Sequence, residues 1–160
     1  MSSNQPSLPR WHPVTILLTW FYSGFSSVAP GTCGSLAAIP FAWIVLTLFG
    51  TYTFLIILCF LLVLGIWSSH WALQKLKEKD PKIIVLDEVI GQGLVLAVAP
   101  ITPVSYLLAF ILFRLFDIYK PWPIHLIDNK MKGALGVMLD DVIAGLYGAV
   151  TLLIILELMG

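Results

Sequence analysis

The sequence predicts an all-α integral membrane protein, a compact bundle of about four to five short transmembrane helices preceded by an N-terminal interfacial segment. Composition is the first observation: 59% of the 160 residues are hydrophobic and only 11% are charged, whereas about a quarter of the residues of soluble domains are charged. The second observation is that uncharged turns alternate with charged loops between the apolar segments. The formal net charge is zero, so nothing indicates a nucleic-acid partner.

The N-terminal region divides at about residue 13. Residues 1–13 form a polar tail, and residues 14–160 are long enough for a single membrane-embedded domain. The apolar run at 14–22 is short, so we expect it to lie in the membrane interface. Small residues at 27–29 resemble a signal-peptidase site, but the polar start before a short apolar run disfavours cleavage.

Five apolar segments follow this run along the chain. They cover residues 36–49, 52–73, 89–100, 104–116 and 142–159. The breaks at 49–53 and 99–103 contain Gly, Pro or Thr and no charge, while those at 74–88 and 117–141 are rich in charged residues. This alternation is typical of helical hairpins that enter and leave the bilayer from one side.

The charged loops also predict the orientation of the chain. With five crossings, both loops and Arg10 fall on one side of the membrane and only Glu157 falls on the other. The basic loops should be cytoplasmic, which places the N-terminus inside and the C-terminus outside. Fourteen helical residues cover only about 21 Å, less than a hydrocarbon core of about 30 Å. Three or four crossings therefore stay open beside five.

Acidic residues gather at the helix ends on the predicted cytoplasmic side. Asp87 and Glu88 directly precede one apolar segment, Asp140 and Asp141 precede another, and Asp117 follows a third. A helix N-terminus stabilises a nearby carboxylate by only about 0.3–1 kcal/mol. Helix capping alone is thus a weak explanation for so many carboxylates on one membrane face.

A divalent cation would offset the cost of this arrangement. Neighbouring carboxylates repel one another, and a carboxylate at the bilayer centre costs about 2.5–3.5 kcal/mol. Hard carboxylate oxygens are ligands that suit Mg²⁺. We predict a Mg²⁺ site built from Asp87, Glu88, Asp140 and Asp141, with Asp117 as a further candidate. The alternative is that the acidic pairs only cap and anchor their helices.

The loop at 24–40 has features of a phosphate-binding segment. Gly31 and Gly34 allow the backbone to approach a ligand closely, and Thr32 and Ser35 offer hydroxyl groups. Free N–H groups at the start of the following helix favour an anion. The segment is not a P-loop, because no lysine follows the second glycine. A simple helix cap is the alternative.

Two cations flank Asp117 near the end of another apolar segment. Arg114 precedes Asp117 by three residues, so both can share one helix face. Arg114 and Lys120 are candidate phosphate ligands beside a metal-binding acid. The alternative is an internal ion pair together with a lysine that extends to the membrane surface.

Four motifs, in order from about Gly24 to the C-terminus, resemble the bacterial phosphatidylglycerophosphatase A family. They are "APGTCGSLAAIP", "LDEVIGQ", "FRLFDIYKPWPI" and "GVMLDDVIAGLYGA". The resemblance implies a Mg²⁺-dependent, multi-pass phosphatase of the bacterial cytoplasmic (inner) membrane. Such an enzyme removes the terminal phosphate of phosphatidylglycerophosphate and releases phosphatidylglycerol and inorganic phosphate. Residues 14–160 would then be the catalytic domain, with the phospholipid and the bilayer as partners and the active site facing the cytoplasm.

The resemblance and the residue patterns together assign roles to individual side chains. The expected catalytic residues are Asp117, Asp140 and Asp141; the metal ligands are Asp87, Glu88, Asp140 and Asp141; the phosphate-binding residues are Gly31, Thr32, Gly34, Ser35, Arg114 and Lys120. Attack by water and a covalent aspartyl intermediate on Asp117 or Asp140 both stay open.

Two other classes of protein fit parts of the pattern. A small carrier or cation transporter could use the acidic cluster as an ion site, because intramembrane acids also mark ion pathways. Against it, the acids gather at one membrane face and no internal repeat is visible. A structural membrane subunit would need the acids only as caps. The sequence does not determine the oligomeric state.

Overall fold

The computed structural model describes residues 8–76, 81–131 and 133–159, and all regular structure within these ranges is helical. The elements are α1 (Pro13–Leu18), a short 3₁₀ helix (Ser23–Phe25), α2 (Pro30–Leu76), α3 (Leu86–Val98), α4 (Pro103–Tyr119), α5 (Ile124–Lys130) and α6 (Ala134–Met159). The prediction of an all-α fold is confirmed.

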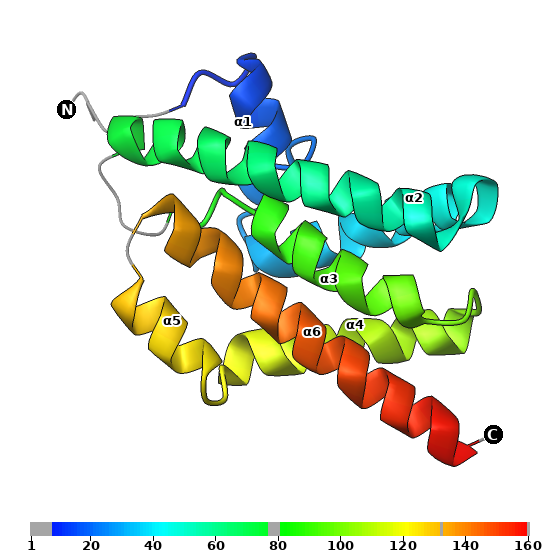
Figure 1. Cartoon of the computed structure of the whole chain (residues 1–160). Helices are drawn as coiled ribbons and strands as arrows, with labels where there is room; N and C mark the ends of the chain where they lie inside the picture. The colour runs from blue at the N-terminus through cyan, green and yellow to red at the C-terminus, as the bar shows by residue number, and fades with distance from the viewer. Residues whose placement is uncertain (1–7, 77–80, 132, 160) are drawn as a thin grey trace.

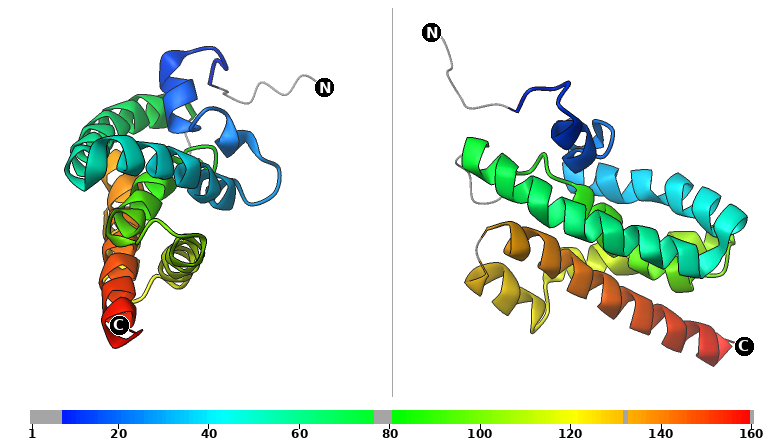
Figure 2. Two further views of the ribbon diagram at one scale, coloured as in Figure 1. Left: turned by 90° about the vertical axis from the view of Figure 1, so that its right-hand side faces the viewer. Right: turned by 45° about the horizontal axis from the view of Figure 1, so that its top comes forward.

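Helix α2 is a hairpin of two arms. Gly50 has φ 77° and ψ 173°, outside the helical region, and glycine adopts a positive φ without the steric cost of a Cβ. The chain reverses there, so the two arms run antiparallel (Figures 1 and 2). This reversal falls in the predicted break at 49–53.

The remaining connections follow the same alternation of short turns and longer links. The Gly50 turn, the turn between α3 and α4, and the C-terminus lie at one end of the molecule (Figure 1). The C-terminal end of α2 and the segment with α5 lie at the other end. Uncharged and charged connections are therefore at opposite ends of the bundle, as the sequence predicts.

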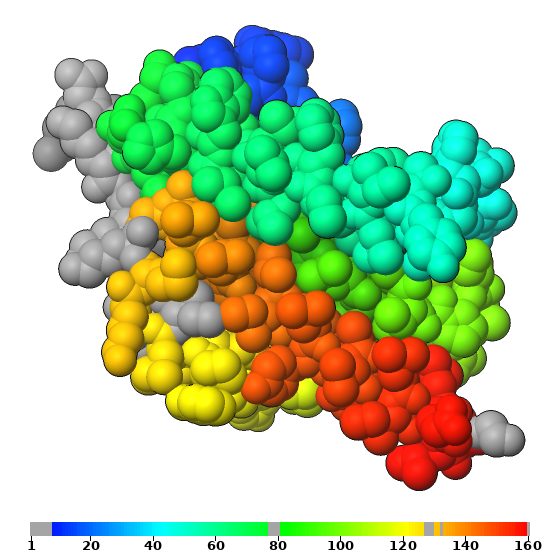
Figure 3. Space-filling view, viewed as in Figure 1, coloured from blue at the N-terminus to red at the C-terminus, as the bar shows by residue number. Residues whose placement is uncertain are grey.

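Helix α3 is the central element. It packs against both α2 and α6, and most of its 13 residues are buried. On the face seen in Figure 3, α3 shows only as a narrow green strip between the second arm of α2 and α6. Because its neighbours cover it, α3 can be nearly all apolar although it is only about 20 Å long.

The contact between α3 and α6 depends on two glycines. A Cβ atom on Gly145 would collide with the carbonyl oxygen of Gly91, and a Cβ on Gly91 would lie 2.5 Å from the carbonyl oxygen of Asp141. The two backbones therefore touch directly. Small residues allow this close approach in membrane helices, and here it brings Asp141 beside the first turn of α3.

The outer surface has the character of a membrane protein. Two helices in the described part of the chain, α2 and α6, are long and apolar enough to cross a membrane. Large apolar side chains such as Phe60, Ile111 and Leu153 are exposed on α2, α4 and α6, far more than the isolated apolar side chains usual on soluble proteins. The predicted count of four to five crossings is not confirmed and stays a prediction.

The N-terminal segment is shorter than the predicted interfacial run at 14–22. Helix α1 has six residues, of which Val14, Thr15 and Leu18 are buried, and it packs against α2. Its position relative to a membrane stays a prediction. The predicted polar tail at 1–13 lies partly outside the described residues, although Leu8 within it is buried.

The close contact between α3 and α6 predicts that a larger side chain at Gly145 destabilises the protein. We expect Gly145→Val to lower the free energy of unfolding by about 1–3 kcal/mol, the usual cost of inserting carbon atoms into a packed interface. The measurement is the thermal unfolding midpoint in detergent. Leu146→Val is the control, because Leu146 is the next residue and is exposed; equal effects of the two changes would contradict the interpretation.

Candidate active site

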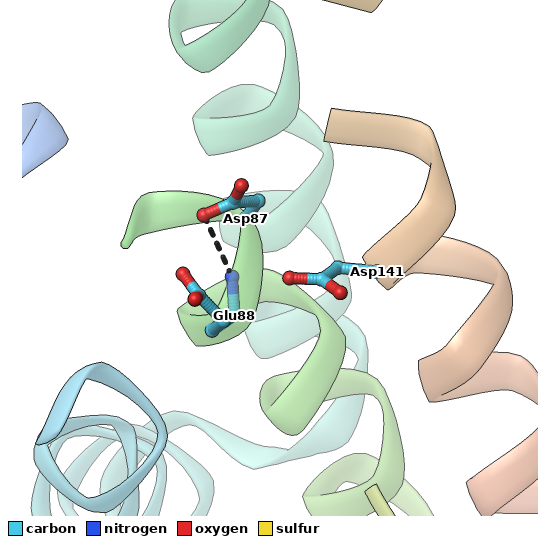
Figure 4. Close-up of side chains that lie close together, drawn as sticks. All are labelled: Asp87, Glu88 and Asp141. Carbon is cyan, nitrogen blue, oxygen red and sulfur yellow. Dashed lines mark hydrogen bonds between the residues drawn. The ribbon is translucent and has the colours of Figure 1, made fainter. Parts of the chain in front are cut away.

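Three carboxylates converge between α3 and α6. Asp87 and Glu88 are in the first turn of α3, and Asp141 extends toward them from α6 (Figure 4). One oxygen atom from each of the three side chains lies within 4.8 Å of the others. Asp87 is 7% exposed and Asp141 is 4% exposed, so the cluster is largely shielded from its surroundings.

Local backbone structure fixes the two acids of α3. The N–H of Val85 donates to the carbonyl oxygen of Leu18 at 2.9 Å, which ties the residue before α3 to the end of α1. The N–H of Glu88 donates to Asp87 Oδ1 at 3.1 Å. Asp87 thereby accepts from one of the free N–H groups that every helix start presents.

Asp140 and Asp141 are adjacent in sequence but face different partners. Lys120 Nζ donates to Asp140 Oδ2 at 2.7 Å, while Asp141 joins the cluster with Asp87 and Glu88. Successive residues of a helix point about 100° apart, so one aspartate can face α4 and the other α3. Three of the four predicted metal ligands therefore lie together, and Asp140 forms an ion pair with Lys120.

The end of α4 supplies the cations. Arg114 forms an ion pair with Asp117, three residues further along the same helix. Lys120 adopts a left-handed conformation, with φ 41° and ψ 61°, where α4 ends. Arg114 and Lys120 thus pair with Asp117 and Asp140, and these two acids are not members of the three-carboxylate cluster.

The start of α2 closes the site. A Cβ atom on Gly31 would collide with the carboxylate of Glu88 and lie 3.4 Å from Arg114 Nη1. A side chain at Gly31 would therefore displace the Glu88 carboxylate and contact Arg114. The helix start and the charged side chains surround a cavity of about 660 Å³. Its polar lining includes Thr32, Lys82, Asp87, Glu88, Arg114, Asp117, Lys120, Asp140 and Asp141.

Two of the predicted phosphate-binding residues lie outside the lining of this cavity. Ser35 is fully buried, and its hydroxyl donates to the carbonyl oxygen of Gly31 at 2.9 Å. A Cβ on Gly34 would lie 2.7 Å from Val85 Cβ, so Gly34 allows α2 to pack against the residue before α3. Ser35 and Gly34 therefore hold the start of α2 in position, whereas Gly31 and Thr32 line the cavity.

Two polar residues near the site are absent from the sequence-based assignment. Lys82 lines the cavity and belongs to the predicted charged break at 74–88. Gln92 is fully buried one helical turn after Glu88, and its amide atoms have no hydrogen-bond partner among the described residues. The signal for Gln92 is a polar amide in an otherwise apolar segment.

The donor set of the cluster fits a hard divalent cation. Carboxylate oxygens are the ligands that Mg²⁺ prefers, and three are gathered here. Glu88 Oε2 is buried and has no hydrogen-bond partner within the described ranges. A buried carboxylate oxygen without a partner is costly, and a bound cation would satisfy it.

Comparisons with known proteins agree on one family. The model of the family described as phosphatidylglycerophosphatase A matches residues 16–156. Phosphatidylglycerophosphatase A of Escherichia coli (strain K12) is 36% identical over 140 residues, which cover 87% of this chain and 79% of the relative. The protein of the same name from Haemophilus influenzae is 37% identical over 153 residues, 94% of each chain.

A third relative has a different name. The putative phosphatidylinositol-3-phosphatase of Bacteroides thetaiotaomicron is 40% identical over 146 residues, 87% of this chain and 90% of the relative. All three relatives are named as phosphatases of phosphorylated phospholipids. No solved structure matches the chain.

The ion pair between Lys120 and Asp140 should couple the two residues energetically, which a double-mutant cycle can test. We expect Lys120→Met and Asp140→Asn together to destabilise the protein less than the sum of the single changes, with a coupling energy of about 0.5–3 kcal/mol. The measurement is thermal unfolding in detergent. The same cycle with Lys120→Met and Glu157→Gln should be additive, because Glu157 lies near the C-terminus; additivity in both cycles would contradict the pair.

Proposed function

The chain belongs to the phosphatidylglycerophosphatase A family and is a phosphoric monoester hydrolase, and from this premise we propose the finer details of its reaction. The proposed substrate is phosphatidylglycerophosphate, whose terminal phosphate is hydrolysed to give phosphatidylglycerol and inorganic phosphate. The proposed cofactor is Mg²⁺, and the proposed location of the site is the cytoplasmic face of the bacterial inner membrane. The observation that carries the proposal is the convergence of three carboxylates with two cations around one cavity.

Asp87, Glu88 and Asp141 would hold the metal ion. When bound, Mg²⁺ neutralises phosphate charge and lowers the pKa of a bound water molecule. These three side chains come from two helices whose backbones touch at Gly91 and Gly145. A rigid support of this kind keeps ligand oxygens in place without the substrate.

The phosphate would lie between the start of α2 and the end of α4. Gly31 and Thr32 line the cavity at the N-terminal end of α2, where free N–H groups and the helix dipole favour an anion. Arg114 and Lys120 line the opposite part of the wall. Arg114 can donate two parallel hydrogen bonds to a phosphate, and Lys120 acts as a point charge.

We favour direct attack by water over a covalent aspartyl intermediate. The two candidate nucleophiles, Asp117 and Asp140, each hold a cation, and a carboxylate engaged in this way is a poor nucleophile. In the proposed step the water oxygen forms a bond to phosphorus, and the bond from phosphorus to the glycerol oxygen breaks. The water proton passes to a phosphate oxygen and from there to the leaving glycerol oxygen. Asp117, which lines the cavity, keeps Arg114 in place at its wall.

The position of the cavity supports phosphatase chemistry over ion transport. The cavity is formed where α2, α3 and α6 begin and α4 ends, hence at one end of the bundle. A transport site would lie near the middle of the helices. A site at the end of the helices instead meets a phospholipid headgroup while the acyl chains stay in the bilayer.

The proposed reaction is tested by phosphate release from phosphatidylglycerophosphate in mixed micelles. We expect release with Mg²⁺ and none with excess chelator. Asp141→Asn should lower kcat about 100-fold or more, because even an outer partner of a metal ligand typically contributes 10–100-fold. Glu157→Gln, near the C-terminus and away from the cavity, should retain activity.

Two results of this assay would contradict the proposal. Folded wild-type protein that releases no phosphate in Mg²⁺ would exclude phosphatidylglycerophosphate as the substrate. Equal activity in chelator would exclude the metal. Phosphatidylinositol 3-phosphate belongs in the same assay, because one relative is named for it; faster release from this lipid would change the proposed substrate but not the site.

Metal binding has a readout that does not depend on activity. We expect Mg²⁺ to raise the thermal unfolding midpoint of the wild type, since a ligand at 100 times its Kd stabilises a protein by about 2.7 kcal/mol. Asp141→Asn should abolish this shift, while Glu157→Gln should keep it. A shift of the same size in Asp141→Asn would show that the ion binds elsewhere.

A further inference from the structure

A second cavity lies along the same two helices that form the phosphate side of the site. It has a volume of about 440 Å³ and is lined by Ile39 and Trp43 from the first arm of α2, by the turn before α4, and by Tyr106 and Leu107 from α4. Its lining is almost entirely apolar, unlike that of the first cavity. Trp43 and Leu107 are 53% and 60% exposed, so the cavity opens to the outer surface of the bundle.

The two cavities occupy the same face of each helix. On α2, Thr32 lines the first cavity, and Ile39 and Trp43, seven and eleven residues later, line the second. On α4, Leu107 lines the second cavity, and Arg114, seven residues later, lines the first. Spacings of seven and eleven return to one side of a helix. The first arm of α2 and α4 also lie on the same side of α3 (Figure 2, left).

Apolar side chains bridge the distance between the two cavities. Leu36 is four residues from Thr32 on α2, and Ile111 is four residues from Leu107 on α4; both are about half exposed. Thr32 and Ile39 are about 10.5 Å apart along the helix axis, as are Leu107 and Arg114. The route from the charged cavity to the apolar one is therefore short and has no charged side chain at these intermediate positions.

We propose that this apolar cavity and the strip leading to it bind one acyl chain of the phospholipid substrate. The inference rests on the proposed function, since it requires the phosphate to lie in the first cavity. When the headgroup of a lipid lies in the first cavity, its acyl chains must extend from that cavity along an apolar surface. One bilayer leaflet contributes about 15 Å of hydrocarbon, half of a core of about 30 Å. The nearer part of the second cavity, at Leu107, is about 10.5 Å along α4 from Arg114 and falls within that depth.

The test compares a long-chain and a short-chain substrate. Dioleoyl and dibutyryl phosphatidylglycerophosphate share a headgroup, and only the first reaches the second cavity. We expect Leu107→Trp, which fills the cavity, to lower the ratio of kcat/KM for the long chain to that for the short chain by roughly tenfold, the scale on which apolar pockets distinguish chains. Leu153→Trp is the matched control, because Leu153 is exposed on α6 outside both cavities, and it should leave the ratio unchanged.

A binding measurement makes the inference independent of turnover. In chelator, phosphatidylglycerophosphate with brominated chains, at low mole fraction in unbrominated micelles, should quench tryptophan fluorescence saturably. Trp43→Phe should remove that quenched component, and unbrominated substrate should displace it. Two results would overturn the acyl-chain site. One is that Leu107→Trp lowers kcat/KM equally for the long-chain and the short-chain substrate. The other is that Trp43→Phe leaves the quenching unchanged.

The possible failures are distinguishable. Wild type inactive on both substrates contradicts the proposed reaction, whereas the quenching result still decides whether a chain occupies the cavity. An unchanged chain-length ratio in an active Leu107→Trp contradicts the acyl-chain site alone. If that variant also changes the oligomer mass in detergent, a second copy of the chain covers this face instead.

Discussion

The backbone contact between α3 and α6 is the constraint on which the rest of the structure depends. Gly91 and Gly145 let the two helices touch without intervening side chains. Asp141 lies one turn before Gly145, and Glu88 lies three residues before Gly91, so the same contact places acids from both helices within reach of one another. A larger residue at either glycine would separate the helices and the carboxylates with them.

The acids of the site divide into three groups with different electrostatic surroundings. Asp117 is paired with Arg114, and Asp140 with Lys120, so each has a compensating charge. The remaining three carboxylates face one another in a buried place. Repulsion among them is large where the dielectric is low, and a divalent cation is the simplest partner that offsets it. The paired cations remain at the cavity wall, where a phosphate would approach.

The molecule is polar at one end and apolar along its sides, as its proposed substrate is. Gly31 brings the start of α2 against Glu88 and Arg114, which closes the charged cavity at the end of the bundle. The first arm of α2 and α4 then continue from this cavity with apolar side chains. In the proposed binding mode, a phosphorylated lipid would meet charge at its headgroup and apolar side chains along its acyl chains.

The sequence by itself determined the helical class, the uncharged turns at 49–53 and 99–103 and the types of residue in the site, because these follow from composition and local spacing. It did not show that α6 begins at Ala134, inside the predicted charged break at 117–141. Tertiary structure alone decided that Asp141 joins the acids of α3 while Asp140 turns to Lys120, since adjacent helical residues face different neighbours and only packing selects those neighbours. Packing likewise placed Ser35 behind the cavity and Lys82 in its wall. Packing also placed α3 at the centre of the bundle, where its neighbours cover it. The length and apolar character of this segment do not predict that position.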